Sequence, residues 1–157
     1  MVRPLVSIVI PCHNARQWIS QCIRSAIDQA YVHKEIIVVD DGSTDGSQDV
    51  IRSFGDRIRS EFAPNRGSNF ARNRLLELSR GSWLSFLDAD DYLLPEKIER
   101  QMEAVERNKD VAVVSSPPIE FIEKTGETYR QTFEDDDLLA NYIGWERFST
   151  TACLWRR

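Results

Sequence analysis

The fold is decided by two stretches of sequence, Glu35-Ile36-Ile37-Val38-Val39-Asp40-Asp41-Gly42-Ser43 and Trp83-Leu84-Ser85-Phe86-Leu87-Asp88-Ala89-Asp90-Asp91. In each, a run of β-branched or aromatic residues, typical of a buried strand, ends abruptly in aspartates. One Asp-Gly pair would indicate only a turn, but two acidic clusters after two buried strands favour a functional site. Ligands of open parallel α/β sheets bind just outside the carboxyl ends of the strands, so we expect both clusters to face one crevice. Carboxylates held that close need a divalent cation or a hydrogen-bonding ligand to offset their repulsion.

Strands and helices are predicted to alternate along the first two thirds of the chain. Strands are expected over 5–10, 35–39, 58–62, 83–87 and 111–114, and helices over a segment that begins at Asn14 and over 45–54, 69–79 and 95–108. This order predicts an α/β, Rossmann-like fold with a mainly parallel sheet and helices on both faces.

Local signals place the ends of the first elements. Pro11 is expected to stop the first strand, because proline cannot donate to a sheet. Asn14, with Gln17 three residues later, has the pattern of a capping box and is expected to cap the first helix. The apolar face of that helix, which includes Trp18, is expected to pack into the core.

The pattern changes after Pro117-Pro118. Segments 119–123 and 129–133 are expected to form a hairpin, and the acidic run 134–137 an exposed loop. A last strand is expected over 148–155, and we expect the fold to continue beyond residue 157.

Composition narrows the class of protein. A chain of 157 residues suits one domain, and its net charge of −5 argues against a nucleic-acid partner. The three cysteines lack the spacing of a zinc site, so reduced thiols are expected. No apolar run reaches the length of a membrane span, and no signal peptide is expected.

Four motifs follow one another along the chain: Val6-Ser7-Ile8-Val9-Ile10-Pro11-Cys12-His13-Asn14, Val38-Val39-Asp40-Asp41-Gly42-Ser43-Thr44-Asp45, Asn65-Arg66-Gly67 with Ala71-Arg72-Asn73, and Phe86-Leu87-Asp88-Ala89-Asp90-Asp91. Each is weak alone. In this order and spacing they resemble glycosyltransferase family 2, whose members have the GT-A fold. The resemblance runs from about Val6 to Ser116. The family usually has an aromatic residue where this chain has His13, a change that bears on base stacking.

The resemblance implies roles for the acidic residues and for one arginine. Asp41 would accept a hydrogen bond from the uracil N–H, which suits an acceptor-only carboxylate. Asp88 would face the ribose and the sugar, and Asp90 would bind Mn²⁺ or Mg²⁺. Arg72, near a helix N-terminus, would meet the diphosphate. Asp91 is expected to cap the next helix rather than to bind metal.

Pro11 and Asn14 would shape the loop under the uridine. The resemblance thus implies a single GT-A-like domain over 1–157, with a nucleotide-sugar-binding part over 1–116. The remainder, 117–157, would form the hairpin and the start of the acceptor part.

The implied reaction is inverting transfer of a sugar from a nucleoside-diphosphate sugar, most simply a UDP-sugar, to a hydroxyl of a glycan or lipid-linked acceptor. Metal and Arg72 would stabilise the leaving diphosphate, and a carboxylate would act as general base. That base is expected beyond residue 157, and no residue is assigned to it. A cytoplasmic protein, peripheral to the membrane through its acceptor, is expected.

Three other classes remain open at this stage. A receiver domain would need a lone phosphoacceptor aspartate and a later lysine after a strand, whereas Lys109 precedes one. A nucleotidyltransferase would need a glycine-rich loop after the first strand, and residues 11–15 contain no glycine. A non-catalytic nucleotide-binding module is the third alternative.

Overall fold

The computed structural model describes residues 3–116, 119–122, 125–130 and 153–157. In chain order its elements are β1 (Val6–Cys12), α1 (Ile19–Ile27), β2 (Lys34–Asp41), α2 (Ser47–Arg52), a 3-10 helix (Gly55–Arg57), β3 (Arg59–Ala63), α3 (Ser68–Leu78), β4 (Trp83–Phe86), α4 (Lys97–Arg107), β5 (Val113–Ser115), β6 (Ile119–Ile122), β7 (Glu127–Arg130) and β8 (Cys153–Arg156). The predicted alternation of strands and helices is therefore confirmed, with ends displaced by one or two residues for most elements.

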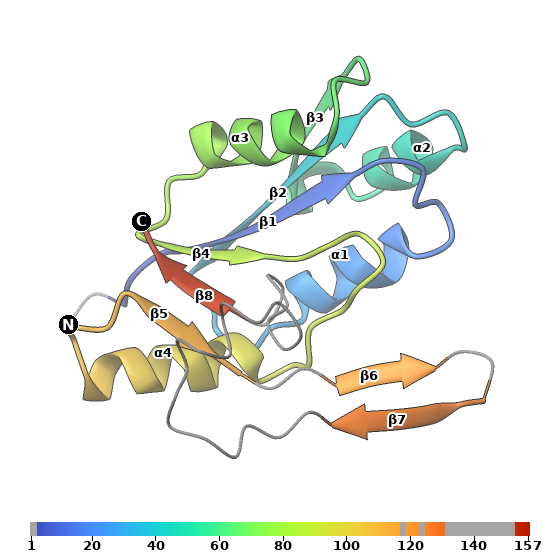
Figure 1. Ribbon diagram of the computed structural model, residues 1–157. Helices are drawn as coiled ribbons and strands as arrows, with labels where there is room; N and C mark the ends of the chain where they lie inside the picture. The colour runs from blue at the N-terminus through green and yellow to red at the C-terminus, as the bar shows by residue number, and fades with distance from the viewer. Residues whose placement is uncertain (1–2, 117–118, 123–124, 131–152) are drawn as a thin grey trace.

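The central sheet has six strands in the order β3-β2-β1-β4-β8-β5 (Figure 1). Strands β1, β2, β3 and β4 run parallel to one another, which confirms a mainly parallel sheet. Strand β8 lies between β4 and β5 and is antiparallel to both. It is the described end of the strand predicted over 148–155. The acidic run 134–137 lies outside the described residues.

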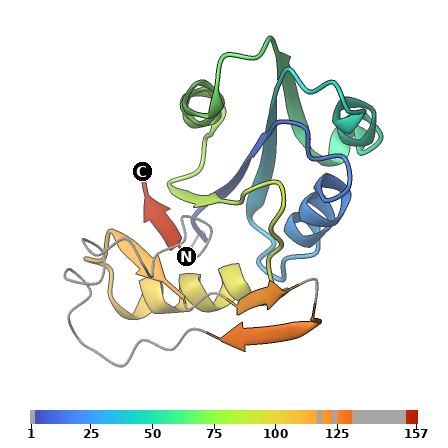
Figure 2. The same ribbon diagram turned by 45° about the vertical axis from the view of Figure 1, so that its right-hand side comes forward.

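Helices cover both faces of the sheet, as predicted (Figure 2). Helix α3 packs on one face, where Ala71, Leu75 and Leu78 meet Val9 and Ile37. The buried apolar residues of α1, α2 and α4 belong to the core on the other face. Strands β6 and β7 pair antiparallel in a separate sheet, which confirms the hairpin. Within the described ranges, no helix combines the length and apolarity needed to cross a bilayer.

Pro11 lies inside β1, so the prediction that it stops this strand is wrong. The carbonyl of Val9 accepts a hydrogen bond from Leu87, on the β4 side. Residues two apart in a parallel strand point to the same side, so the nitrogen of Pro11 also faces the β4 side. Strand β4 has already ended there, at Phe86. The absent N–H of proline therefore costs the sheet no hydrogen bond.

The predicted helix caps are also corrected. Helix α1 begins at Ile19, five residues after Asn14, and its N-cap is Trp18. Asn14 instead adopts the left-handed conformation, with φ of 50°. Helix α4 begins at Lys97 with Glu96 as its N-cap, so Asp91 does not cap it.

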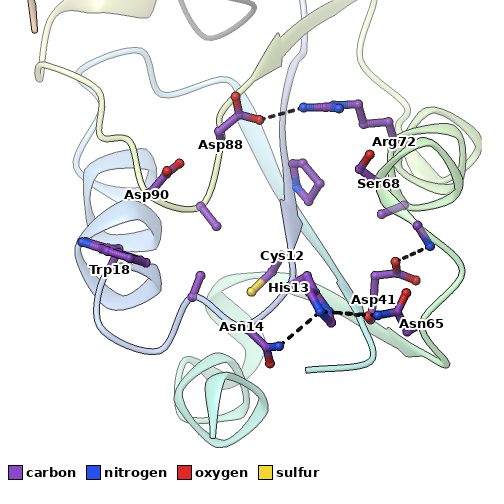
Figure 3. Close-up of a pocket in the computed structure, with 15 residues that line it drawn as sticks. Cys12, His13, Asn14, Trp18, Asp41, Asn65, Ser68, Arg72, Asp88 and Asp90 are labelled. Atoms are coloured by element: carbon purple, nitrogen blue, oxygen red, sulfur yellow. Dashed lines mark hydrogen bonds and ion pairs between the residues drawn. The ribbon is translucent and has the colours of Figure 1, made fainter. Parts of the chain in front are cut away.

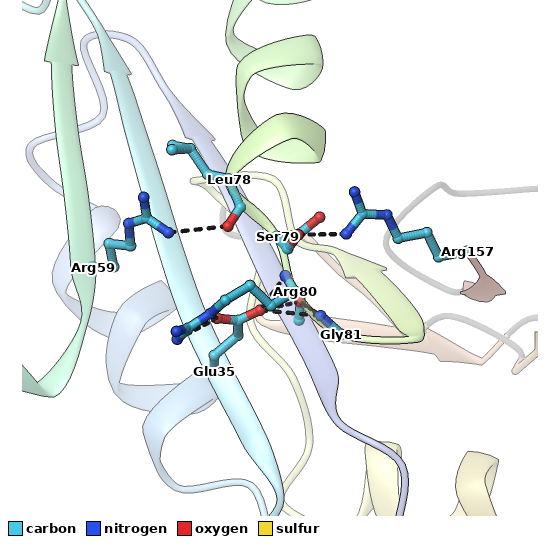
Figure 4. A network of polar contacts seen from close by, with 8 residues as sticks. Glu35, Arg59, Leu78, Ser79, Arg80, Gly81 and Arg157 are labelled. Carbon is cyan, nitrogen blue, oxygen red and sulfur yellow. Dashed lines mark hydrogen bonds and ion pairs between the residues drawn. The ribbon is translucent and has the colours of Figure 1, made fainter.

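The two edges of the parallel sheet differ. The C-terminal ends of β1, β2 and β4 open into a cleft, drawn in Figure 3. The N-terminal ends are closed by a polar network around Glu35 on β2 (Figure 4). Its carboxylate accepts hydrogen bonds from the Ser7 hydroxyl at 2.6 Å, the Arg80 amide at 2.6 Å and the Gly81 amide at 3.2 Å. A side chain at Gly81 would lie 2.7 Å from the Leu5 carbonyl oxygen, so only glycine fits.

The same network sets the charge state of Glu35. Burial raises the pKa of this carboxyl group, but the hydrogen bonds from Ser7 and Arg80 and the charge of Arg80 outweigh it, and the net pKa is lowered from 4.5. A carboxyl group whose folded pKa is lowered stabilises the fold above its unfolded pKa. That contribution is lost as the pH falls through the folded value.

We expect Glu35→Gln to lower the free energy of unfolding by about 1.5–3 kcal/mol at neutral pH, because charge-assisted hydrogen bonds are lost. The difference from the parent chain should shrink as the pH falls below 4.5. Denaturant unfolding at several pH values measures both effects. Glu96→Gln is the matched control, because Glu96 forms an exposed ion pair with Arg100 on α4 and should change stability by less than about 0.5 kcal/mol. A pH-independent difference for Glu35→Gln would contradict the linkage.

Candidate functional site

The cleft has a volume of about 470 Å³ and lies where β1, β2 and β4 end (Figure 3). Its lining residues are Pro11, Cys12, His13, Asn14, Ala15, Trp18, Asp41, Asn65, Gly67, Ser68, Ala71, Arg72, Asp88, Ala89 and Asp90. All six residues predicted to serve the site line this one cleft. Of the aspartates in the two acidic clusters, Asp41, Asp88 and Asp90 converge on this cleft, whereas Asp40 and Asp91 are not among its lining residues.

Asp40, the neighbour of Asp41 on β2, is fully buried. Its Oδ1 accepts hydrogen bonds from the Ser43 amide at 3.0 Å and the Gln48 side chain at 2.8 Å. Its Oδ2 is buried without a hydrogen-bond partner in the described part of the chain. Burial and the nearby charge of Asp40 raise the pKa of the Cys12 thiol to about 12, so this thiol stays neutral.

Asp41 holds one wall of the cleft in place. Its side chain is 3% exposed, and its two oxygens accept hydrogen bonds from the backbone amides of Arg66 at 2.8 Å and Gly67 at 2.7 Å. The neighbouring Gly42 has a φ of 73°, and a Cβ there would lie 2.5 Å from the Asn65 nitrogen. The end of β2 and the segment before α3 are therefore fitted directly against each other. Each carboxylate oxygen has further acceptor capacity, so Asp41 can also accept from a ligand.

His13 is held by its edge. Its Nδ1 lies 2.8 Å from the Asp41 carbonyl oxygen, so Nδ1 carries the proton and donates it. Its Nε2 then accepts from the side-chain amides of Asn14 at 3.1 Å and Asn65 at 3.4 Å. One neutral tautomer satisfies all three contacts and leaves the faces of the ring for stacking.

The loop after β1 is joined to the loop after β2 by hydrogen bonds of 2.8–2.9 Å between backbone amides and side-chain oxygens. They run from Asn14 N to Ser43 Oγ, from Ala15 N to Ser47 Oγ, from Arg16 N to Asp45 Oδ2 and from Thr44 N to Asn14 Oδ1. The hydroxyl of Ser47, with the backbone amides of Arg16 and Ser47, lowers the pKa of Asp45 to about 2 and outweighs the opposing effect of burial. Asn14 thus joins two loops rather than capping α1.

Arg72 and Asp88 form an ion pair across the cleft. The Nη2 of Arg72 lies 3.2 Å from Oδ1 of Asp88, and the side chains are 39% and 34% exposed. Arg72 lies on the second turn of α3. Ser68 and Ala71, in the first turn of that helix, also line the cleft. The amides of Phe70 and Ala71 bond to the Gly67 carbonyl, whereas the first two amides of the helix lack intrahelical acceptors. The start of α3 therefore presents N–H groups to a ligand beside the guanidinium of Arg72.

Asp90 is exposed and makes no hydrogen bond or ion pair with any described residue. In the part of the chain that the structure describes, no three histidine, cysteine, aspartate or glutamate side chains converge to hold a metal. The protein alone therefore offers no closed cage. An open carboxylate beside Asp88 does fit a hard cation that takes its other ligands from phosphate and water.

The prediction that Trp18 packs into the core is wrong. The buried residues of α1 are Ile19, Cys22, Ile23 and Ala26, whereas Trp18 is 38% exposed and lines the cleft. Ser68 and Trp18 are cleft residues that sequence reasoning missed. Asn65 belongs to a motif that the sequence singled out, yet no role was drawn from it.

Comparison with known proteins places the chain in a family. The family profile described as Glycosyl transferase family 2 matches residues 7–154. The putative teichuronic acid biosynthesis glycosyltransferase TuaG of Bacillus subtilis (strain 168) is 40% identical over 105 residues, which cover 64% of this chain and 42% of that protein. The chain spans less than half the length of the curated relatives it matches.

Two solved structures resemble the fold. S. aureus TarS 1-349 in complex with UDP-GlcNAc matches with a TM-score of 0.77 at 20% identity, covering 96% of this chain and 45% of that one. The mannosyltransferase PcManGT from Pyrobaculum calidifontis, in complex with GDP-Man and Mn²⁺, matches with a TM-score of 0.64 at 24% identity, covering 73% and 35%. At these identities the likeness shows a shared GT-A fold. The family profile spans nearly all of the sequence, and it therefore rules out the receiver and nucleotidyltransferase alternatives. This chain belongs to glycosyltransferase family 2.

Proposed function

We propose that the cleft binds a UDP-sugar with a divalent cation and that the protein transfers the sugar, with inversion, to a hydroxyl of a glycan or lipid-linked acceptor. The observation that carries the proposal is the convergence of Asp41, Arg72, Asp88 and Asp90 on one cleft at the strand ends. This ligand needs a hydrogen-bond acceptor for its base, a positive charge for its phosphates and an open carboxylate for its metal. Asp41, Arg72 and Asp90 would provide these three groups.

The base would lie at the end of the cleft formed by Asp41, Asn65 and His13. Asp41 is an acceptor for the N–H of uracil, and its position is held by two backbone amides. The exposed faces of His13 provide a stacking surface whose orientation its three edge contacts determine.

The diphosphate would lie against α3. Arg72 would exchange part of its ion pair with Asp88 for bidentate contacts to phosphate, which a planar guanidinium suits. The first turn of α3 would add N–H groups. Asp88, relieved of its partner, would accept hydrogen bonds from ribose or sugar hydroxyls.

Asp90 would hold the metal together with the diphosphate. Bound there, Mn²⁺ or Mg²⁺ supplies charge that stabilises the leaving diphosphate. Mn²⁺ in the PcManGT complex supports a divalent cation in this fold. This chain spans less than half of its relatives, and none of its described residues is assigned as general base.

A GDP-sugar is the second candidate donor, because PcManGT was solved with GDP-Man. A carboxylate can accept from the N–H groups of guanine as well as from uracil. The bases of the two candidate donors, uracil and guanine, differ in size. Titration with UDP and with GDP therefore distinguishes the two candidates.

We expect UDP to bind the parent chain more tightly than ADP or GDP, by about tenfold or more over ADP, because adenine offers Asp41 no imide N–H. Isothermal titration calorimetry with the three diphosphates in the presence of Mn²⁺ measures the preference. Equal affinity for UDP and ADP would refute base recognition by Asp41, and tighter binding of GDP would favour the second candidate.

We expect Asp41→Ala to weaken UDP about tenfold or more and also to expose the Arg66 and Gly67 amides to hydrogen exchange, because both lose their acceptor. Amide exchange measured by NMR separates the two effects. Asp88→Ala is the matched control, since Asp88 lines the same cleft but bonds the Arg72 side chain rather than these amides. Unchanged exchange in Asp41→Ala would show that the hydrogen bonds do not hold this wall.

We expect Asp90→Asn to remove the metal-dependent part of UDP affinity while leaving the fold intact, because the side chain is exposed and unpaired among the described residues. Calorimetry with Mn²⁺ and with chelator gives the difference, which should reach about tenfold in the parent chain. Asp56→Asn, at an exposed aspartate of the 3-10 helix, is the control and should keep the metal dependence. A parent chain whose UDP affinity is the same with chelator would rule out the metal.

A further inference from the structure

Trp18 leaves a large apolar surface in contact with solvent. It is a large aromatic side chain left 38% exposed, whereas Trp83 is 3% exposed. Neither apolar core includes it, because α1 is anchored by Ile19, Cys22, Ile23 and Ala26. An indole that does not pack in the core and lines a cleft is better explained by a ligand than by folding.

The cleft has two chemically distinct sides. Figure 3 shows Trp18 and Asp90 on one side, and Ser68, Arg72 and the Asp41–Asn65 pair on the side of α3. The residues suited to base and phosphate therefore lie across the cleft from Trp18. The other apolar lining residues, such as Ala15, Ala71 and Ala89, are small. Trp18 is the one broad apolar surface among the described lining residues.

A pyranose ring matches this side of the cleft. One face of such a ring carries C–H bonds, and its rim carries hydroxyl groups. The C–H face packs on an indole, whose π-face is negative, while carboxylates accept hydrogen bonds from the rim. Asp88 and Asp90 provide such carboxylates in the same cleft.

We infer that Trp18 is the platform for the pyranose ring of the sugar donor, a specificity-determining contact that rests on the proposed function. The ring would lie on the indole while the diphosphate meets α3. Trp18 therefore selects donors whose sugar has a continuous C–H face, and it contributes nothing to recognition of the nucleotide.

Calorimetry tests this inference through the gain in affinity on going from UDP to a UDP-hexose, in the presence of Mn²⁺. We expect the parent chain to show a gain, and Trp18→Ala to lose about fivefold to tenfold of UDP-hexose affinity while binding UDP as the parent does. Trp18→Phe should retain most of the gain, because a smaller aromatic face remains. Val32→Ala, which shortens an exposed apolar residue that does not line the cleft, is the control and should change neither affinity.

The possible outcomes distinguish a failure of this inference from a failure of the proposed function. A chain that binds neither UDP nor a UDP-hexose overturns the proposed function and this inference together. If UDP binds but Trp18→Ala weakens UDP as much as the UDP-hexose, the indole carries the base and the inference is wrong. If Trp18→Ala changes only the binding of added glycan to the UDP-bound chain, the platform serves the acceptor, and the donor assignment is wrong.

Discussion

The buried carboxylate of Asp41 is the constraint on which the cleft depends. A carboxylate with 3% exposure must be satisfied by the protein, and here the backbone amides of Arg66 and Gly67 do so. The carbonyl group of the same residue accepts a hydrogen bond from Nδ1–H of His13. Three segments that are distant in sequence are thereby brought to one point at the end of β2. The residue for which we propose base recognition is thus also the residue that shapes one wall of the cleft.

Strand β2 carries an acid near each end, and the two acids have opposite uses. At the N-terminal end, Glu35 is satisfied entirely within the fold by Ser7, Arg80 and Gly81. At the C-terminal end, Asp41 opens onto the cleft. The closed edge orders the start of β4 against β1 and β2, and this order aligns the far ends of the same strands. Because all strands of a parallel sheet point the same way, residues that stabilise the fold gather at one edge and residues that line the cleft gather at the other.

The sequence predicted the elements and the position of the cleft because both depend on local patterns. Apolar runs that end in aspartate indicate where strands end, and parallel pairing brings those ends together. Predictions failed where distant contacts decide. Asn14 has the pattern of a cap, but its side chain accepts the Thr44 amide instead. Trp18 has helical apolar spacing, yet it lies one position before α1 and faces the cleft. The insertion of β8 between β4 and β5 is a long-range pairing that no local signal encodes.

The close approach of Gly42 to Asn65 means that the motif after β2 and the motif before α3 can change only together. Because any Cβ at this position would meet the Asn65 nitrogen at 2.5 Å, the turn after β2 cannot change without the segment before α3. Exchange of either motif alone between related chains would separate surfaces that are fitted to each other. An engineer who wishes to transplant this wall of the cleft from a related chain must therefore move residues 41–42 and 65–67 together, as a single cassette drawn from one parent.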